Sequence, residues 1–320
     1  NMIQNNNILS YDTIKLTLTR KCLYTPISFV KEIEKYVDVD IRERHGEVTF
    51  TGKVKNFRIW GNNHYVSLQG SIAKFIKGNN LEDVTLAEVK EGIAELGALL
   101  HLPLEKASLG RVDLSCNLLV DNYPEFYFNY LGELPRFNRR IYENSTLYYE
   151  EKQKTLVFYD KVAEMKHWGN EYVLRFETRV TGYELKRIWN EHWRLTASAL
   201  YDSYFYYMLC RNSRDWYCSI QKKGDNPLDC LFEDIYSSKD IEDRCICYAS
   251  RHLDLQKRLK RQFQNRAKKK SGDAQKHYRM QERIRKALSR SWEFTSLQPL
   301  EWELDYKLHR IFEQSLTITA

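Results

Sequence analysis

A short stretch with the two-residue period of a β-strand, Thr155 to Lys161, constrains the fold of this chain more than any other feature. Successive side chains of an extended chain point to opposite faces, so Tyr159 and Lys161 share one face. Leu156 and Phe158 then form the opposite, apolar face. The pattern predicts a strand that is buried against a core on one side and carries polar side chains on the other.

Two further stretches have the same alternation. From Arg111 to Cys116, Asp113 lies in a polar row that opposes an apolar one. From Val173 to Arg179, the polar row contains Arg175 and Glu177. If the three strands belong to one sheet, their polar rows bring a phenol, two carboxylates and several cations together on one surface.

The order of strand-like and helix-like segments predicts an α+β protein in two parts. Residues 1–182 are expected to form a mixed, mainly antiparallel sheet with covering helices. Thr85 and Glu88 make a capping box that begins one of these helices, and its apolar stripe belongs to the core. From residue 183 to 320 the apolar side chains recur with helical spacing, which predicts a helical C-terminal region.

The polar surface suits phosphodiester chemistry. A tyrosine oxygen can attack a backbone phosphorus and hold the DNA strand as a phosphotyrosine. A phenol has an ordinary pKa of about 10, so Tyr159 needs help to ionise, which Lys161 or a bound cation would supply. Asp113 and Glu177 suit Mg²⁺ or Mn²⁺, which prefer oxygen ligands. The alternative is an ordinary solvated sheet face with no catalytic role.

The positive charge is concentrated near the C-terminus. The whole chain has a net charge of +7, whereas residues 251–290 contain fifteen Lys or Arg against three acids. This predicts a basic helical hairpin that binds duplex DNA by displacing counterions from phosphates. The alternative is a solvated helical pair that aids solubility. The cations expected to bind DNA there are Lys257, Arg258, Arg261, Lys268, Lys269 and Lys270.

Other cations are candidates for DNA contact in the first part of the chain. Arg139 and Arg140 follow Phe137 in a basic run, and this mixture suits single-stranded DNA by charge and base stacking. A plain basic surface loop is the alternative. Lys74 is a candidate for a phosphate contact or a solvated lysine. Arg111 and Arg175, from the polar rows, complete the predicted set.

Six short blocks occur in an order that is informative as a set. They are Tyr11 to Leu16, Val66 to Lys74, Gly110 to Asp113, Glu143 to Tyr148, Thr155 to Lys161 and Leu174 to Arg179. With these blocks the chain resembles the replication initiators of filamentous phages, the gene II/X family. It is more distantly similar to the rolling-circle initiators of small plasmids. The resemblance covers about the first 180 residues.

The resemblance implies roles for individual residues. Tyr159 corresponds to the nicking nucleophile, and Asp113 and Glu177 correspond to acidic residues that we expect to bind the metal. The plasmid relatives have a second acidic residue where this chain has Asn117, so the ligand set would use another group, such as Asp12 or water. Tyr148 and Tyr149, the rival tyrosines, fall in the block before the nicking one.

The implied activity is the start of rolling-circle replication. The protein would nick one strand of a double-stranded origin and stay joined to the 5′ phosphate. A host polymerase, with a host helicase, would extend the 3′ hydroxyl, and the protein would then rejoin the nicked single strand. The alternatives are a plasmid mobilisation relaxase and a non-catalytic origin or operator DNA-binding protein.

The cysteines and the hydropathy predict where the protein works. Seven cysteines without a Cys-x-x-Cys pair favour reduced thiols over a disulfide framework. No apolar run reaches the length that spans a bilayer, so we expect no membrane association. Together these features predict a cytoplasmic protein, and the resemblance implies that the cell is a bacterial host.

Overall fold

A computed structural model describes the chain at residues 6–23, 28–142, 145–165, 172–190, 194–222 and 298–317. The contacts divide it into two compact units. The first contains Asn1–Glu125, Glu133–Gln221 and Asp305–Ala320, and the second contains Phe126–Gly132 and Lys222–Leu304. The sheet and the candidate site belong to the first unit. The functional division predicted between residues 182 and 183 stays a prediction.

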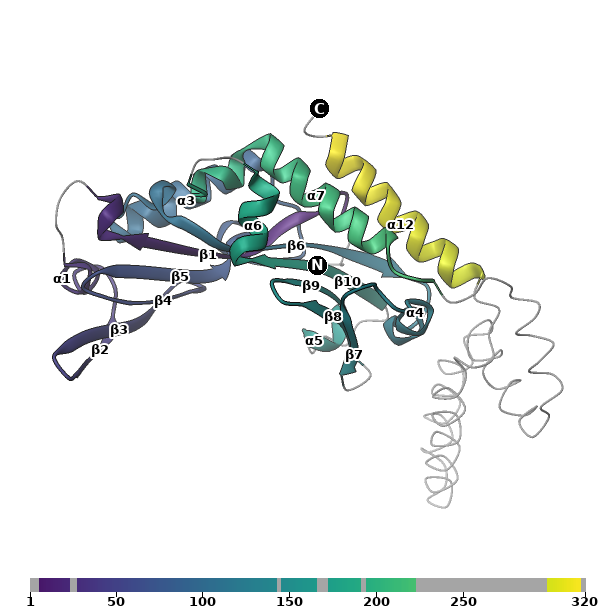
Figure 1. Ribbon diagram of the computed structural model, residues 1–320, viewed down its shortest axis with the longest axis horizontal. Coiled ribbons are helices and arrows are strands. Elements are labelled where there is room, and N and C mark those ends of the chain that lie inside the picture. The colour runs from purple at the N-terminus through teal and green to yellow at the C-terminus, as the bar shows by residue number, and fades with distance from the viewer. Residues whose placement is uncertain are drawn as a thin grey trace, which may run out of the picture. The chain divides into compact units, whose positions relative to one another are not determined.

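The described strands of the first unit form one ten-stranded sheet with the order β2-β3-β4-β5-β1-β6-β10-β9-β8-β7 (Figure 1). Every ladder between them is antiparallel. The predicted α+β class with a mainly antiparallel sheet is therefore confirmed. The strands are β1 (Ser10–Thr19), β2 (Val39–Arg44), β3 (Glu47–Val54), β4 (Phe57–Asn62), β5 (Tyr65–Ser71), β6 (Ser108–Val120), β7 (Asn138–Tyr142), β8 (Thr146–Glu151), β9 (Lys154–Asp160) and β10 (Tyr172–Thr181).

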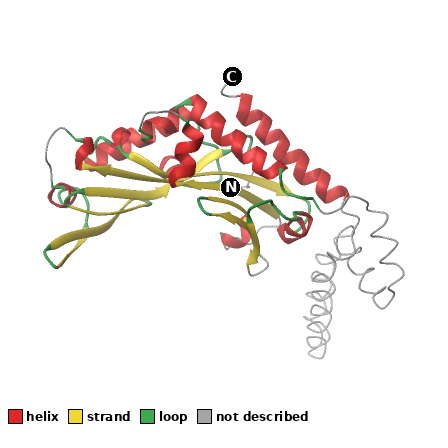
Figure 2. Ribbon diagram, in the orientation of Figure 1, coloured by secondary structure: helices red, strands yellow, loops and turns green. Residues whose placement is uncertain are grey.

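Helices α3, α6 and α7 and the Asp305–Thr317 part of α12 lie along one side of this sheet (Figure 2). The α-helices are α1 (Phe29–Ile33), α2 (Ile72–Lys77), α3 (Leu86–Leu100), α4 (Pro124–Tyr130), α5 (Lys161–Glu164), α6 (Gly182–Trp189), α7 (Ser203–Cys218) and α12 (Gln298–Thr317). Three short 3-10 helices cover Arg20–Cys22, Leu104–Lys106 and Ala197–Tyr201. No helix of the described residues is long and apolar enough to cross a membrane.

The helix-covered side of the sheet contains the aromatic core. Phe158 of β9 and Phe176 of β10 lie 5.0 Å apart between ring centroids, and Phe176 meets Phe312 of α12 edge to face at 5.9 Å. Tyr217 of α7 packs against all three rings. Such tilted and edge-to-face pairs are favoured ring geometries. Because strand side chains alternate, burying this face leaves the polar rows on the opposite one, which carries Tyr159. We call it the site face.

Helix α3 forms as predicted. Thr85 and Glu88 make the capping box, and the apolar stripe, which includes Ile93 and Leu96, is buried. The helix ends at His101, which takes a left-handed conformation with φ of 53°. The basic run before β8 differs from the predicted alternative of a loop, because it enters strand β7 at Asn138 and pairs with β8. Its short, mostly polar sequence gives little apolar alternation to reveal a strand.

Candidate active site

The strand pairing places the three polar rows side by side. Tyr159 of β9 lies opposite Arg175 of β10, which in turn lies opposite Asn117 of β6. Farther along β10 and β6, Arg179 lies opposite Asp113. Directly opposed residues of a sheet project from the same face. The prediction that these strands share one polar surface therefore agrees with the pairing.

Tyr159 is the phenol at the centre of this surface. Its hydroxyl donates a long hydrogen bond of 3.5 Å to Oε2 of Glu177. Burial raises the pKa of Tyr159 well above its ordinary value, and the neighbouring guanidinium of Arg175 opposes this rise. The carboxylates of Glu177 and Glu164 raise the pKa further. The side chain therefore rests as a neutral phenol that is placed beside both a proton acceptor and a cation.

Lys161 does not occupy the strand row in which the alternation placed it. Strand β9 ends at Asp160, whose side chain caps α5 by accepting hydrogen bonds from the backbone of Val162 and Ala163. Lys161 begins that helix, is 1% exposed and pairs with Glu164. Its Nζ lies 5.9 Å from the centroid of the Tyr159 ring. A helix cap interrupts the strand one residue early, yet it keeps the cation beside the tyrosine.

Arg175 is fully enclosed, with 1% of its surface exposed. Its Nη2 donates to Asp12 Oδ2 and Ser115 Oγ, each at 2.7 Å. Its Nη1 donates to Asn117 Oδ1 and the Asn80 carbonyl, each at 2.9 Å. A guanidinium that is buried and held by four acceptors cannot also contact DNA at the protein surface. The structure therefore argues against the predicted DNA contact of Arg175. Asp12 already balances the positive charge of Arg175, and Asn117 adds an uncharged acceptor for the same guanidinium.

The carboxylates of Asp113 and Glu177 are paired with arginines. Arg111 donates two hydrogen bonds to Asp113, of 2.8 and 2.5 Å, and Arg179 Nε donates to Glu177 Oε1 at 2.7 Å. Burial raises the pKa of Asp113 to about 7, with a smaller contribution from the charge of Glu177, against the opposing effect of Arg111. The site therefore contains a carboxyl whose ionised form the fold disfavours.

The donor set fits the chemistry of Mg²⁺ or Mn²⁺. Asp113 and Glu177 supply hard carboxylate oxygens on neighbouring strands of one face. Among the described residues, no three His, Cys, Asp or Glu side chains gather around one point. Mg²⁺ commonly uses one or two carboxylates and completes its shell with water and substrate phosphate. Asp12, the additional ligand considered from the sequence, is engaged by Arg175 and by Ser71.

Because the pKa of Asp113 is raised in the folded state, the stability of the protein should depend on pH. A carboxyl whose pKa is higher in the folded than in the unfolded state costs stability as pH rises from about 4 to about 7. Asp113→Asn removes that ionisation. We expect the variant to be more stable than the wild type by about 1 to 3 kcal/mol above pH 8, and to lose this advantage near pH 5. Urea unfolding in EDTA at the two pH values measures the difference.

Asp40→Asn is the matched control for this prediction. It also removes a carboxylate from an arginine pair, with Arg42 at 2.8 Å, but both side chains are exposed. Exposed pairs contribute about 0 to 1 kcal/mol, so the control is expected to change little at either pH. If Asp113→Asn destabilised the protein equally at both pH values, the burial argument would be wrong.

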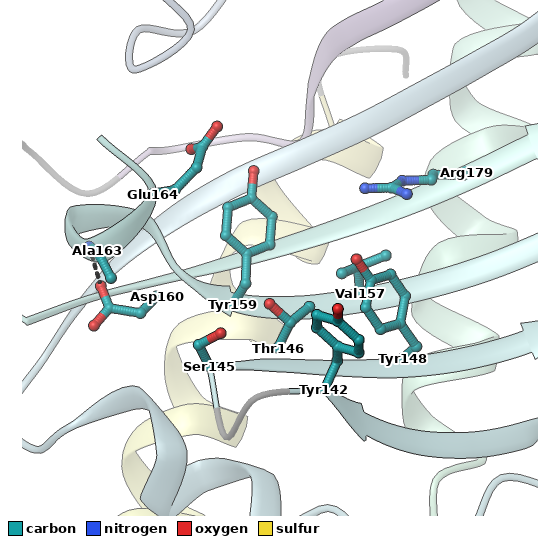
Figure 3. Close-up of a pocket in the computed structure, with 10 residues that line it drawn as sticks. All are labelled: Tyr142, Ser145, Thr146, Tyr148, Val157, Tyr159, Asp160, Ala163, Glu164 and Arg179. Carbon is teal, nitrogen blue, oxygen red and sulfur yellow. Dashed lines mark hydrogen bonds between the residues drawn. The ribbon is translucent and has the colours of Figure 1, made fainter. Parts of the chain in front are cut away.

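A pocket of about 440 Å³ opens beside Tyr159 on the site face (Figure 3). In the figure, Tyr159 stands between Glu164 of α5 and Arg179 of β10. The other lining residues come mainly from β7, β8 and β9 and their connections, and four of them carry a phenol or hydroxyl group. They are Tyr142, Ser145, Thr146, Tyr148, Val157, Asp160 and Ala163. An open pocket with aromatic and hydroxyl walls beside a buried cation can receive part of a nucleotide.

The structure separates the other predicted residues by face. Arg140 and Tyr148 are opposed on β7 and β8 and share the site face, since Tyr148 also lies opposite Val157 of β9. Arg139 and Tyr149 are opposed on the other face, and the hydroxyl-bearing ring of Tyr149 is buried. Burial thus removes Tyr149 as a rival nucleophile, whereas Tyr148 stays in the pocket.

Of the remaining predicted DNA contacts, Lys74 and Arg111 lie within the described residues. Lys74 is exposed on α2. The six basic residues from Lys257 to Lys270, and the predicted helical hairpin that carries them, lie outside the described residues. Arg111 is on the site face, but its guanidinium is held by Asp113. Arg111 can therefore contact DNA only when its hydrogen bonds to Asp113 are broken.

Sequence reasoning missed several residues of the site. Arg179 pairs with Glu177 and lines the pocket, and its place in the polar row of β10 was a signal for this role. Glu164 pairs with Lys161 through one helical turn, and the cap at Asp160 was its only sequence signal. Asn80 reaches Arg175 through its backbone carbonyl, which no side-chain pattern could reveal.

The fold and site define an α+β protein with a tyrosine held among arginines and carboxylates on one sheet face. Residues 49–197 match the family described as the N-terminal part of a phage replication-associated protein. This stretch is a little under half of the chain and includes Asp113, Tyr159 and Glu177. The match confirms the resemblance of these residues to the phage gene II replication initiators.

A solved structure is also similar to this chain. It is a rolling circle replication initiator protein from Geobacillus stearothermophilus, with 10% sequence identity and a TM-score of 0.39. The likeness covers 65% of this chain and 85% of that chain. A structural likeness this distant carries no argument about chemistry. No curated protein matches the sequence.

Proposed function

We propose that this protein initiates rolling-circle replication by nicking one strand of a double-stranded origin through Tyr159 and later rejoining it. The observation that carries the proposal is the placement of the Tyr159 hydroxyl, 3.5 Å from Glu177 at the edge of a pocket that Arg179 also lines. The match to a phage replication-associated family supports replication over plasmid transfer as the setting.

The proposed reaction is an in-line phosphoryl transfer. The Tyr159 oxygen forms a bond to phosphorus as the bond from phosphorus to the 3′ oxygen breaks. The phenol proton passes to the carboxylate of Glu177, and the leaving 3′ oxygen takes a proton from solvent. The product is a 5′ phosphotyrosine and a free 3′ hydroxyl. Rejoining reverses these steps, with Glu177 returning the proton to the phenol.

Fixed cations would stabilise the charge that develops during transfer. Arg179 lies at the pocket, and Lys161 lies beside the Tyr159 ring. Arg175 lowers the pKa of Tyr159 against the effect of burial, so it favours the phenolate that attacks. Since Arg175 is enclosed, we assign it a positioning role in place of a DNA contact. Such preorganised charges cost no rearrangement at the moment of reaction.

Asp113 and Glu177 are the residues that would hold Mg²⁺ or Mn²⁺. When bound, the ion supplies positive charge that polarises the phosphate and helps the 3′ oxygen to leave. Asp113 presents a carboxylate whose ionised form is costly without a cation, as its raised pKa indicates. Arg111 and Arg179 neutralise the two carboxylates in the absence of an ion. They would be released toward phosphate when the ion binds.

The rest of the chain would supply affinity for the origin. We propose residues 1–182 as the nicking and rejoining domain and residues 183–320 as a helical DNA-binding region. In the latter, the lysines and arginines between Lys257 and Lys270 would bind duplex phosphates. The free 3′ hydroxyl would be extended by a host polymerase, with a host helicase separating the strands. This activity belongs in the cytoplasm of a bacterial cell.

A nicking assay tests the proposal. Supercoiled DNA that carries the origin of the source replicon is incubated with the protein and Mg²⁺ or Mn²⁺, and parallel samples contain EDTA. We expect nicked circles with protein attached to the 5′ end, and a loss of at least about a hundredfold in nicking rate when EDTA removes the ion. Binding of the origin without any nicking in either metal would favour a non-catalytic DNA-binding protein.

A further inference from the structure

A row of polar side chains crosses five neighbouring strands of the site face, away from Tyr159. Lys53 of β3 lies opposite Arg58 of β4, which lies opposite Gln69 of β5. Gln69 lies opposite Lys15 of β1, and Lys15 lies opposite Arg111 of β6. Since neighbouring strands are about 4.8 Å apart, the row extends for roughly 19 Å. Four of its five side chains are cations on one face.

Trp60 stands beside this row. It lies two residues along β4 from Arg58, so it projects from the same face. The Lys15 ammonium is 5.4 Å and the Arg58 guanidinium 5.6 Å from the centroid of its ring, and the indole is half-buried. Its neighbours across the sheet are Thr51 and Ser67, which are small. Because the indole is only half-buried, part of the ring is exposed, and another flat group can stack there.

Among the described residues, the cations of this row lack carboxylate partners except for Arg111, at the end nearest the candidate active site. Arg111 and Arg179 are neutralised by carboxylates, as described above. Lys15, Lys53 and Arg58 take part in no ion pair of the described chain. Cations without carboxylate partners are available to phosphates, and the exposed part of the Trp60 ring is available to a base.

The row is continuous with the candidate active site. Tyr159 contacts Glu177, whose partner Arg179 lies opposite Asp113. Asp113 is bound by Arg111, and Arg111 is the last member of the row. A polyanionic chain bound along the row therefore reaches the tyrosine without leaving the site face. Along this path the DNA would first meet unpaired cations and the indole of Trp60. It would then meet the paired arginines and Tyr159.

We propose that Lys53, Arg58, Trp60 and Lys15 form a binding track for the single-stranded DNA that adjoins the nick. The cations bind phosphates, and the Trp60 ring stacks on one base. The inference rests on the proposed nicking function for its direction toward Tyr159, although binding along the track requires no chemistry. A single strand suits the track because its bases are free to stack on an aromatic ring.

The test uses the full chain, a short fluorescein-labelled single-stranded oligonucleotide and EDTA, so that no nicking occurs. Fluorescence anisotropy measures affinity at several salt concentrations. We expect Trp60→Leu to weaken binding about tenfold through loss of stacking. The logarithm of affinity falls as the logarithm of salt concentration rises, and Arg58→Gln should make this negative slope shallower by about 0.7, the value for one single-strand phosphate contact.

The matched control is the Lys90 and Tyr201 pair on the helix side of the sheet. The Lys90 ammonium lies 5.8 Å from the centroid of the Tyr201 ring, so the pair has the same chemistry as the track. Lys90→Gln and Tyr201→Leu should leave oligonucleotide affinity unchanged. Because Arg58 is exposed, Arg58→Gln should not impair folding, and it keeps the test decisive if Trp60→Leu is unstable.

A second readout is independent of total affinity. An oligonucleotide that contains 5-iodouracil is crosslinked by ultraviolet light, and the modified peptide is found by mass spectrometry. We expect the crosslink in the peptide that contains Trp60. Unchanged affinity in both track variants, or crosslinks only elsewhere, would overturn the track. A protein that binds the oligonucleotide through Trp60 but never nicks would instead overturn the proposed function alone.

Discussion

Tyr159→Phe is expected to abolish nicking and covalent attachment to DNA, with a loss of rate of at least about 10³-fold. The change removes one oxygen atom, which is the proposed nucleophile, and retains the ring that packs beside Lys161. The lost hydrogen bond to Glu177 is long, so the fold should be little affected. Nicking of the supercoiled origin and labelling of the DNA 5′ end by protein are the measurements.

Tyr148→Phe is the control for the nucleophile. Tyr148 lines the same pocket from β8 and shares the site face, so its variant tests a second phenol in nearly the same surroundings. It should retain nicking within about tenfold of the wild type, since it removes at most a contact to the bound strand. Nicking that survives in Tyr159→Phe and disappears in Tyr148→Phe would mean that Tyr148 is the nucleophile.

Arg175→Met is expected to destabilise the protein by about 3 to 5 kcal/mol at neutral pH, the cost of breaking a buried ion pair. Burial raises the pKa of Asp12, but Arg175 and the hydrogen bonds from Ser71 and Asn80 outweigh it, and the pKa is lowered overall. Removing the arginine leaves that carboxylate buried without a cation. Urea unfolding measures the loss, with circular dichroism as the check on the native fold.

The ion pair of Arg175 and Asp12 also determines how the stability deficit of Arg175→Met changes with pH. A carboxyl with a lowered pKa contributes stability above its unfolded pKa of about 3.9, and this stability is lost as pH falls through the folded value. The deficit of Arg175→Met should therefore be largest at neutral pH and should shrink in acid. A deficit that did not change with pH would show that lost packing, and not the uncompensated charge of Asp12, is its cause.

A double-mutant cycle separates the ion pair from the rest of the network. Asp12→Asn combined with Arg175→Met removes both charges, so the double variant should be more stable than the sum of the single effects by about 2 kcal/mol. A coupling energy near zero would contradict the assigned pairing. Because Arg175 also supports the Tyr159 surroundings, restored stability without restored nicking would agree with its proposed positioning role.

The alternation of polar and apolar residues determined much of the site by itself. It placed Tyr159, Asp113 and Glu177 on the polar faces of their strands, and the pairing of β6, β9 and β10 agrees. The capping box at Thr85 was equally readable. These features could be predicted because strand alternation and helix capping depend on residues close in the sequence.

Only the tertiary structure decided how these side chains are used. In the sequence, Arg175 is one polar-row cation among several, but segments distant in the sequence enclose it, through Asp12 of β1 and the Asn80 carbonyl. Lys161 left the strand because Asp160 caps a helix there. The row from Lys53 to Arg111 depends on the register of five strands. Local pattern gives the face of each strand, whereas burial, ion pairing and register depend on which segments pack together.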